Sequence, residues 1–312
     1  EPLTFEDVMN IVELETPNGV LVQFGGQTPL NIATKLEKAG VNIIGTKPSA
    51  IDLAENRKKF GNVLSKLNIP APDWGTATSV KAAINVAKKV SYPLLVRPSY
   101  VLGGRGMEIV YDDDELTKYV SKATIISGEH PILIDKFLED AYEFDVDALC
   151  DGNDVFIGGI MQHIEEAGIH SGDSACVIPA YQLTSHSRKL IEKYTKKLAL
   201  ELNTIGLINI QFAMKNNIIY VIEVNPRASR TIPFISKVIN IPLAKIAAQL
   251  AVGNKLKNMN LNINKQKGLI AVKKPVFPFN KFPKQNIFLS PEMKSTGEVI
   301  GFDSYLGSAY AK

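Results

Sequence analysis

The chain has 312 residues, a length typical of about two domains. Its residues are 45% hydrophobic and 21% charged, and its net charge of +3 is too small to indicate nucleic acid or an anionic membrane surface as a partner. Two cysteines and no run of about 18 apolar residues exclude a disulfide framework and a membrane span, so we expect a cytoplasmic protein. The chain begins with Glu1 and Pro2 rather than Met, which suggests a piece of a longer protein.

The first part of the chain alternates helices and strands, as α/β sheets do. Thr4 and Asp7 are spaced as a capping box, and Ser49 is predicted to cap the last helix of this part. The predicted elements are a helix over about 5–15, a strand at 19–24, a helix ending at about 38, a strand at 41–44 and a helix from 49 to about 67. This order predicts a parallel sheet, and we expect residues 1–48 to form a partial α/β domain.

A cluster of prolines and a glycine at 70–75 marks a break in the chain. The elements predicted after it are a helix over about 79–90, strands at 94–97 and 107–111 around a Gly-rich turn, a helix over about 114–127 and a strand at 132–136. We therefore expect residues 49–138 to contain a linker helix and a small subdomain.

The remainder of the chain has an antiparallel pattern. Its predicted elements are strands at 143–150 and 155–164, a helix over about 187–202, a hairpin of 205–212 and 218–224 around Lys215-Asn216-Asn217, and a helix over about 242–252. We expect a core domain at 139–260 and a C-terminal extension at 261–312, and the predicted fold class is α/β (α+β).

The hairpin carries the most informative polar residues. Gln211, Glu223 and Asn225 alternate with apolar residues, so on paired strands they can share one face, and their oxygen atoms suit Mg²⁺. Arg227 and Arg230 follow directly and can hold anionic oxygens, a combination that favours phosphoryl transfer from a nucleotide. The alternative is a plain hairpin in which Asn225 only begins a turn.

A Gly-rich segment at 98–107 is a candidate phosphate loop, because Gly103 and Gly104 let backbone N–H groups approach phosphate oxygens. Its spacing fits neither a Walker A loop nor a Rossmann fingerprint, and the alternative is an ordinary Gly-rich hairpin. Arg97 ends the preceding strand and is predicted to face an anion; the alternative is an ion pair with a nearby carboxylate. The composition around Arg57 favours a solvated helix face.

Small polar residues are dense at 168–175, after His163, Glu165 and Glu166, and this density suggests a site for an ion or for sugar hydroxyls. Taken alone, His170 is more typical of a hydrogen-bonded structural histidine. No Ser/His/Asp set or Cys/His pair stands out and no zinc-ligand spacing is present, which disfavours nucleophilic catalysis and a zinc site.

Five segments together resemble the ATP-grasp superfamily, and within it the large subunit of carbamoyl-phosphate synthetase. They are VQFGGQTPLNIA (22–33), VRPSYVLGGRGMEIVY (96–111), EEAGIHSGDSA (165–175), NIQFAMKN (209–216) and IEVNPRASRTIPFISK (222–237). The resemblance covers nearly the whole chain. It implies an ATP-grasp fold preceded by a truncated parallel α/β domain like the N-terminal domain of biotin carboxylase.

The large subunit of that family has two similar halves, and three segments look like the second half: PSYVLGGR (98–105), DKFLEDAYEFDVDALCDG (135–152) and VFPFNKFP (276–283). The resemblance implies that this half phosphorylates carbamate with ATP, whereas the first half activates bicarbonate. It also implies partners, namely the first half, a glutamine amidotransferase part and a regulatory domain, in pyrimidine or arginine synthesis.

The resemblance assigns roles to individual residues. For ATP it implies phosphate contacts by Arg57 and Arg97, a lid at Gly103, Gly104 and Gly106, adenine contacts by Lys136 and Leu138, a ribose contact by Glu143, and a pocket completed by Gly168, Ile169, His170 and Ser171. For metals it implies two Mg²⁺ or Mn²⁺ ions on Gln211, Glu223 and Asn225, and a K⁺ ion among Glu143, His163, Glu165, Glu166, Ile169 and Ser174. For catalysis it implies Arg97, Asn225, Arg227 and Arg230.

Two positions depart from the family pattern. Lys136 stands where some relatives have His, and Glu166 stands where they have Gln, which would add a negative charge beside the potassium ion. Two alternatives stay open: another ATP-grasp ligase, including the bicarbonate-using half, and a nucleotide-binding regulatory module without catalysis. A Rossmann dehydrogenase is disfavoured, because Gly25-Gly26-Gln27 lacks the fingerprint spacing.

Overall fold

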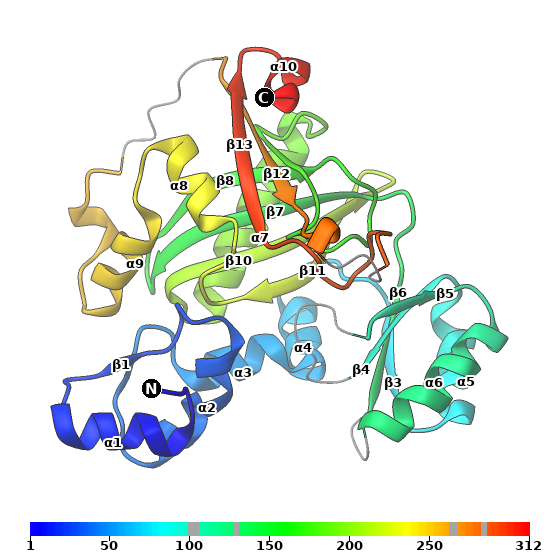
Figure 1. Cartoon of the computed structure of the whole chain (residues 1–312), viewed down its shortest axis with the longest axis horizontal. Helices are drawn as coiled ribbons and strands as arrows, with labels where there is room; N and C mark the ends of the chain where they lie inside the picture. Colours follow the sequence, from blue (N-terminus) through cyan, green and yellow to red (C-terminus); the bar gives the residue numbers. More distant parts are fainter. Residues whose placement is uncertain (99–105, 128–130, 262–267, 282–285) are drawn as a thin grey trace.

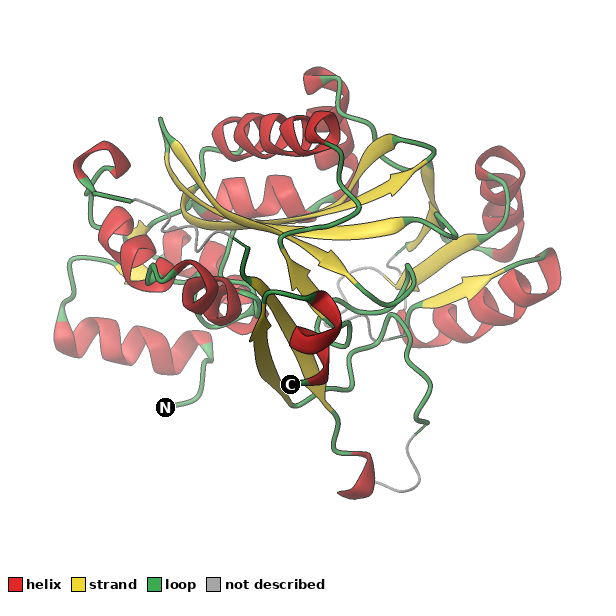
Figure 2. Cartoon of the chain, turned by 90° about the horizontal axis from the view of Figure 1, so that it is seen from above, coloured by secondary structure: helices red, strands yellow, loops and turns green. Residues whose placement is uncertain are grey.

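The structure is a computed structural model that describes residues 1–98, 106–127, 131–261, 268–281 and 286–312. Within these residues the strands form three sheets, of two, four and seven strands, with helices packed on them (Figure 1). The two-stranded and four-stranded sheets lie at the edge of the molecule, and the seven-stranded sheet forms its centre (Figure 2).

The N-terminal part of the chain has the predicted parallel pair of strands. Its elements are α1 (Phe5–Glu15), β1 (Val20–Leu21), α2 (Gln27–Lys38) and β2 (Ile43–Ile44). Thr4 caps α1 by accepting a hydrogen bond from the Asp7 N–H at 3.2 Å, and β1 pairs with β2 in parallel. The predicted N-terminal cap by Thr4 and the parallel order are therefore confirmed.

The single helix predicted from Ser49 to residue 67 is wrong, because two helices occupy this span. They are α3 (Pro48–Glu55) and α4 (Arg57–Leu67). Pro48 starts α3 one residue earlier than predicted, so Ser49 lies inside the helix and does not cap it. Asn56 is extended, and its side chain accepts a hydrogen bond from the Lys59 N–H at 3.1 Å, which begins α4. Arg57 consequently stands at the start of a helix and not in its middle.

The four-stranded sheet has the order β3-β6-β4-β5, with antiparallel neighbours throughout. Its elements are β3 (Trp74–Ala77), α5 (Val80–Val90), β4 (Leu94–Pro98), β5 (Glu108–Val110), α6 (Asp113–Ser127) and β6 (Ile132–Lys136). All were predicted except β3, whose Gly75 suggested a break in the chain. A Cβ atom at Gly75 would meet the Val86 side chain at 2.5 Å, so the glycine permits α5 to pack closely on β3.

The central sheet has the order β11-β10-β7-β8-β9-β12-β13, and each neighbouring pair is antiparallel. Its strands are β7 (Tyr142–Asp151), β8 (Val155–His163), β9 (Cys176–Ile178), β10 (Ile205–Lys215), β11 (Ile218–Asn225), β12 (Ile270–Val276) and β13 (Gly297–Asp303). The predicted turn between β10 and β11 is confirmed, with φ of 51° at Asn216 and 62° at Asn217.

Helices cover both faces of the central sheet. They are α7 (Ser185–Glu201), α8 (Ile232–Ile239), α9 (Leu243–Ala251) and α10 (Leu306–Ala311), with short 3-10 turns at Leu256–Asn258 and Phe279–Lys281. The sequence predicted α7 and α9 but missed α8, α10, β9, β12 and β13. In the described part of the chain no single helix is long and apolar enough to span a membrane; α8 and α9 meet the length and composition criteria only as a pair bent by 108°.

Alternation along β7 divides the two faces. Phe144, Val146 and Ala148 belong to the apolar cluster that includes α7 residues, whereas Leu149 belongs to the cluster of α8 and α9 on the other face. The carboxylates Glu143, Asp145 and Asp147 share the face of Leu149, but they lie closer to the start of the strand. One half of this face is therefore apolar and covered by helices, and the other half is polar.

Candidate active site

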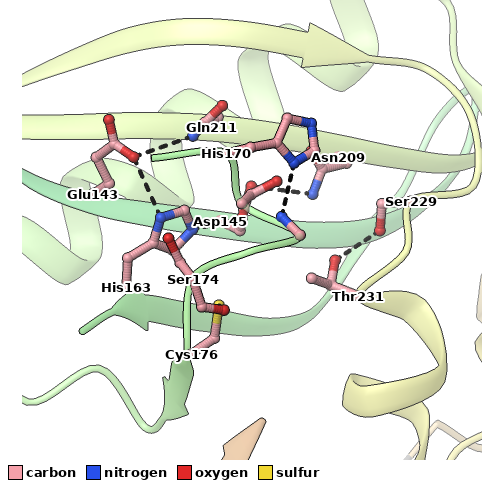
Figure 3. Close-up of polar contacts among 12 residues, drawn as sticks. Glu143, Asp145, His163, His170, Ser174, Cys176, Asn209, Gln211, Ser229 and Thr231 are labelled. Atoms are coloured by element: carbon pink, nitrogen blue, oxygen red, sulfur yellow. Dashed lines mark hydrogen bonds and ion pairs between the residues drawn. The ribbon is translucent and has the colours of Figure 1, made fainter. Parts of the chain in front are cut away.

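The predicted metal ligands meet on the polar half of the sheet face. Gln211 pairs directly with Glu223 across the strands, and Asn225 pairs with Asn209. The Asn225 amide donates to Glu223 Oε1 at 2.8 Å, and the Gln211 amide approaches Glu143 Oε2 at 3.4 Å (Figure 3 shows Gln211 and Glu143). The carboxylate oxygens of Glu223 and the amide oxygens of Gln211 and Asn225 are ligand types that suit a hard cation. The described residues contain no group of three His, Cys, Asp or Glu side chains arranged for a metal.

Both predicted substrate arginines lie on one loop after β11, residues 226–231, which we name the arginine loop. Arg227 Nη1 donates to the Ala228 carbonyl at 3.4 Å, and its buried Nε has no hydrogen-bond partner. Arg230 is exposed. Among the described residues neither guanidinium group forms an ion pair, so both are available to an anion.

A second pair of arginines shares one carboxylate. Asp135, on β6, forms an ion pair with Arg57 and lies 3.6 Å from Arg97 Nε. The guanidinium group of Arg57 also lies 5.6 Å from the centre of the Trp74 ring. The solvated face expected from the composition around Arg57 is wrong, since its side chain is only 8% exposed. The ion pair considered as the alternative for Arg97 is present.

The predicted adenine residues lie at the end of β6. The Lys136 ammonium donates to the carbonyls of Tyr92 at 2.5 Å and Ser91 at 3.1 Å, and burial followed by repulsion from Lys215 lowers its pKa. Leu138 lies two residues further along the chain and is half-buried. The lid glycines Gly103 and Gly104 lie outside the described residues, whereas the carbonyl of Gly106 accepts a hydrogen bond from Tyr119 Oη at 2.6 Å.

His163 lies between two carboxylates (Figure 3). Its Nε2 is 2.8 Å from Asp145 and its Nδ1 is 3.3 Å from Glu143. Burial alone would lower the pKa of His163, but interactions with Cys176, Asp145 and Glu143 outweigh it and raise the pKa well above 6.5. Burial also raises the pKa of the neighbouring Cys176 thiol. His163 thus links the side chains of Glu143 and Asp145.

The remaining residues assigned to potassium lie between β8 and β9, at positions 165–174. Glu165 accepts a hydrogen bond from the Ala175 N–H at 2.5 Å. The Ser174 hydroxyl is buried and has no hydrogen-bond partner among the described residues, as expected of an oxygen that ligates a cation. Ile169 is half-buried, whereas Glu166 is exposed.

The turn at 168–171 contacts the carboxylate of Glu143. The Gly168 N–H donates to Glu143 Oε1 at 3.2 Å, and its φ of +91° together with the nearby Phe137 ring leaves no room for a side chain. His170 Nδ1 accepts from the Gly172 N–H at 3.0 Å, and burial lowers the pKa of His170. The Ser171 carbonyl accepts from the buried Lys273 at 3.1 Å.

Sequence reasoning missed several polar residues of this site. Asp135, Asp145 and Asp147 are buried carboxylates, and the alternation of EFDVDA at 143–148 was a signal that could have identified the last two. Glu55 accepts a hydrogen bond from Gln27 at 2.8 Å, and burial raises its pKa although the charge of Arg227 acts to lower it. No local signal pointed to Glu55.

The chain matches two family models. Residues 56–259 match the ATP-binding domain of the carbamoyl-phosphate synthase L chain, and residues 1–53 match the carbamoyl phosphate synthase preATP-grasp domain. The carbamoyl phosphate synthase large chain of Archaeoglobus fulgidus is 58% identical over 312 residues, which cover 100% of this chain and 29% of that relative. The C-terminal section of the Methanocaldococcus jannaschii large chain is 52% identical over 326 residues, which cover 100% of this chain and 53% of that relative.

Solved structures share the fold. Biotin carboxylase of Campylobacter jejuni, in a β-γ-ATP complex, matches with a TM-score of 0.72 and 20% identity over 88% of this chain and 63% of its own. The biotin carboxylase domain of Hydrogenobacter thermophilus 2-oxoglutarate carboxylase, with MgADP and bicarbonate, matches with the same values. The predicted fold class, an ATP-grasp fold after a biotin-carboxylase-like N-terminal part, is confirmed. The chain belongs to the carbamoyl-phosphate synthase large-chain family and contains an ATP-grasp region of that family.

Proposed function

We propose that this chain is the second, carbamate-phosphorylating half of a carbamoyl-phosphate synthase large chain. The observation that carries the proposal is that Gln211, Glu223 and Asn225 share one sheet face, directly before a loop whose two guanidinium groups form no ion pair with any described residue. In phosphoryl transfer, catalysis is mostly positioning and neutralisation of charge.

In the proposed reaction a carbamate oxygen attacks the γ-phosphorus of ATP. A bond forms between this oxygen and phosphorus while the bond from phosphorus to the β–γ bridging oxygen breaks, so carbamoyl phosphate and ADP leave. The protein supplies no covalent nucleophile. Arg97 stabilises the transferred phosphoryl group, and Arg227 and Arg230 hold the carbamate and the developing charge.

The remaining residues are proposed to bind ATP and cations. Arg57 contacts the phosphates, Lys136 and Leu138 lie against the adenine, Glu143 holds the ribose, and residues 168–171 close the pocket. Gln211, Glu223 and Asn225 would hold Mg²⁺ or Mn²⁺, and the bound metal would neutralise phosphate charge. The unpaired Ser174 hydroxyl supports a K⁺ ion beside Glu143.

Sequence features support the second half rather than the first. The segments at 98–105, 135–152 and 276–283 resemble the second half, and the C-terminal section of the Methanocaldococcus jannaschii chain aligns with all of this chain. The chain spans less than a third of the Archaeoglobus relative, so the first half and an amidotransferase part are proposed partners. The product would serve pyrimidine or arginine synthesis.

The reverse partial reaction tests the proposal. The purified chain is incubated with carbamoyl phosphate, Mg-ADP and K⁺, and ATP formation is followed. We expect ATP, and we expect Glu223→Gln to abolish it while the melting temperature stays unchanged. The matched control is Glu201→Gln, the same chemical change in a surface ion pair with Lys66, and it keeps full activity.

Each contrary outcome has a clear meaning. An unchanged rate in Glu223→Gln at saturating Mg²⁺ would refute the metal role of Glu223. Bicarbonate-stimulated release of ADP from ATP, without ATP synthesis from carbamoyl phosphate, would favour the bicarbonate half. Tight nucleotide binding, measured by calorimetry, with no chemistry in either direction would favour a regulatory module.

A further inference from the structure

The arginine loop is anchored at four of its six residues by hydrogen bonds to two residues from distant parts of the chain. Gln23, two residues after β1, contacts Pro226 through its side chain and Ala228 through its main chain. Asp147, on β7, contacts Ser229 and Thr231. The two residues that neither Gln23 nor Asp147 contacts, Arg227 and Arg230, carry the guanidinium groups.

Gln23 joins the N-terminal part of the chain to this loop. Its side-chain amide donates to the Pro226 carbonyl at 2.8 Å, and its main-chain carbonyl accepts from the Ala228 N–H at 3.0 Å. Thr46 orients the amide, because its hydroxyl accepts from Gln23 Nε2 at 3.0 Å and its N–H donates to Gln23 Oε1 at 3.1 Å. Both side chains are buried, at 2% and 0% exposure, so the contacts are shielded from water.

Asp147 holds the other end of the loop. Its carboxylate accepts hydrogen bonds from Ser229 Oγ at 2.8 Å, from Thr231 Oγ1, and from Asn209 Nδ2 at 3.0 Å. The Ser229 and Thr231 hydroxyls also lie 2.7 Å apart (Figure 3). Asp147 is fully buried, and it forms no ion pair with any described residue.

A buried carboxylate that is not paired with a cation usually contributes little net stability to a fold. Removing such a charge from water costs several kcal/mol before its hydrogen bonds offset the loss, and apolar residues of similar size usually stabilise a core as well or better. What a carboxylate supplies in addition is direction, since its two oxygens fix two hydroxyls at defined positions. Here those hydroxyls flank Arg230.

We propose that Asp147 and Gln23 are positioning residues that hold the arginine loop so that Arg227 and Arg230 face the phosphoryl acceptor. The inference rests on the proposed function for the identity of that acceptor. It makes the N-terminal part of the chain a component of the active site, because Gln23 acts through the backbone of the loop. Loss of either anchor should lower turnover through the arginines and leave nucleotide binding unchanged.

The test uses Thr231→Val and Ser229→Ala, which remove the hydroxyls but keep the shape of the loop, and Gln23→Leu for the other anchor. We expect kcat of the reverse reaction to fall at least about 10-fold in each, because small misplacements of catalytic groups have large kinetic costs. The Kd of Mg-ADP should change less than about twofold, since Arg57 and Arg97 are untouched. Ile191→Val, which removes one buried methyl group in α7, is the control for general destabilisation and should retain kcat.

Combining Thr231→Val with Arg227→Ala and Arg230→Ala separates positioning from general stability. If Thr231 acts through the arginines, Thr231→Val has no further effect on kcat in their absence. An equal loss of kcat in both backgrounds would overturn the inference, as would unchanged kcat in all three anchor variants.

A readout independent of catalysis keeps the inference separate from the proposed function. The Nε–H signals of the arginines are recorded by NMR in the wild-type chain and in the anchor variants. We expect the signals of Arg227 and Arg230 to shift or broaden in the variants while those of Arg57 and Arg97 stay in place. If the wild-type chain makes no ATP, the proposed function fails and these signals still decide the positioning role. Unchanged signals of Arg227 and Arg230 would refute it.

Discussion

The molecule presents two pairs of arginines by different means. Arg57 and Arg97 face the shared carboxylate Asp135, so their charges are already partly neutralised inside the protein. Arg227 and Arg230 have no ion pair among the described residues, and the backbone of their loop is held instead. An incoming phosphate must compete with Asp135 for the first pair of guanidinium groups, whereas no ion pair among the described residues occupies the second pair. We therefore expect loss of the shared carboxylate in the first region to change stability, and substitutions in the second region to change turnover with little effect on stability.

The largest effect on stability should come from Asp135→Asn. This change leaves two guanidinium groups close together, one of them nearly buried, and we expect the free energy of unfolding to fall by about 3–5 kcal/mol. Urea denaturation measures it, and Glu201→Gln, in an exposed pair with Lys66, should cost less than about 1 kcal/mol. Mg-ATP should restore part of the loss, because its phosphates replace the missing negative charge. Equal costs for the two variants would remove the contrast between the regions.

Removal of single arginines should lower turnover in both regions but should change the free energy of unfolding by different amounts. Arg97→Ala and Arg230→Ala should each lower turnover by about 100-fold, since each removes charge stabilisation from the transition state. Arg230→Ala should leave the free energy of unfolding within about 0.5 kcal/mol, because its side chain is exposed and unpaired. Arg97→Ala should cost up to about 1 kcal/mol, because its contact to Asp135 is long, at 3.6 Å, and 28% of its side chain is exposed. Denaturation and steady-state kinetics measure both, and a lowered melting temperature with normal turnover would make Arg97 a structural residue.

A pH-dependent effect concerns Asp147, the anchor of the second region. Burial raises the pKa of Asp147 to about 6, and Asp145 adds to this, while hydrogen bonds from Thr231, Ser229 and Asn209 oppose it. The folded state therefore binds the Asp147 proton more tightly than the unfolded state does. As the pH rises from about 4 to 6, the free energy of unfolding should fall by about 3 kcal/mol at most. Asp147→Asn should lack this loss, which comparison of urea denaturation at pH 4.5 and pH 7 measures. A constant stability difference between the two proteins would contradict the raised pKa.

The polar alternation of the central strands could be predicted from the sequence. Gln211, Glu223 and Asn225 share a face because side chains alternate along a strand, and the Asn216-Asn217 turn fixes the register of the hairpin. The long helices were also predictable from their periodicity. Strands β9, β12 and β13 were missed, since β9 is only three residues long and the other two contain Pro275 and Gly301, which weaken the strand pattern.

Local sequence by itself thus determined which side chains share a face of the hairpin and that two arginines follow it. The tertiary structure alone decided which carboxylate meets Arg57 and Arg97, because Asp135 lies on a separate strand. It also decided that Gln23 holds a loop 203 residues further along the chain. The physical reason is that alternation and capping act over a few residues, whereas the satisfaction of buried polar groups depends on which distant segments pack together.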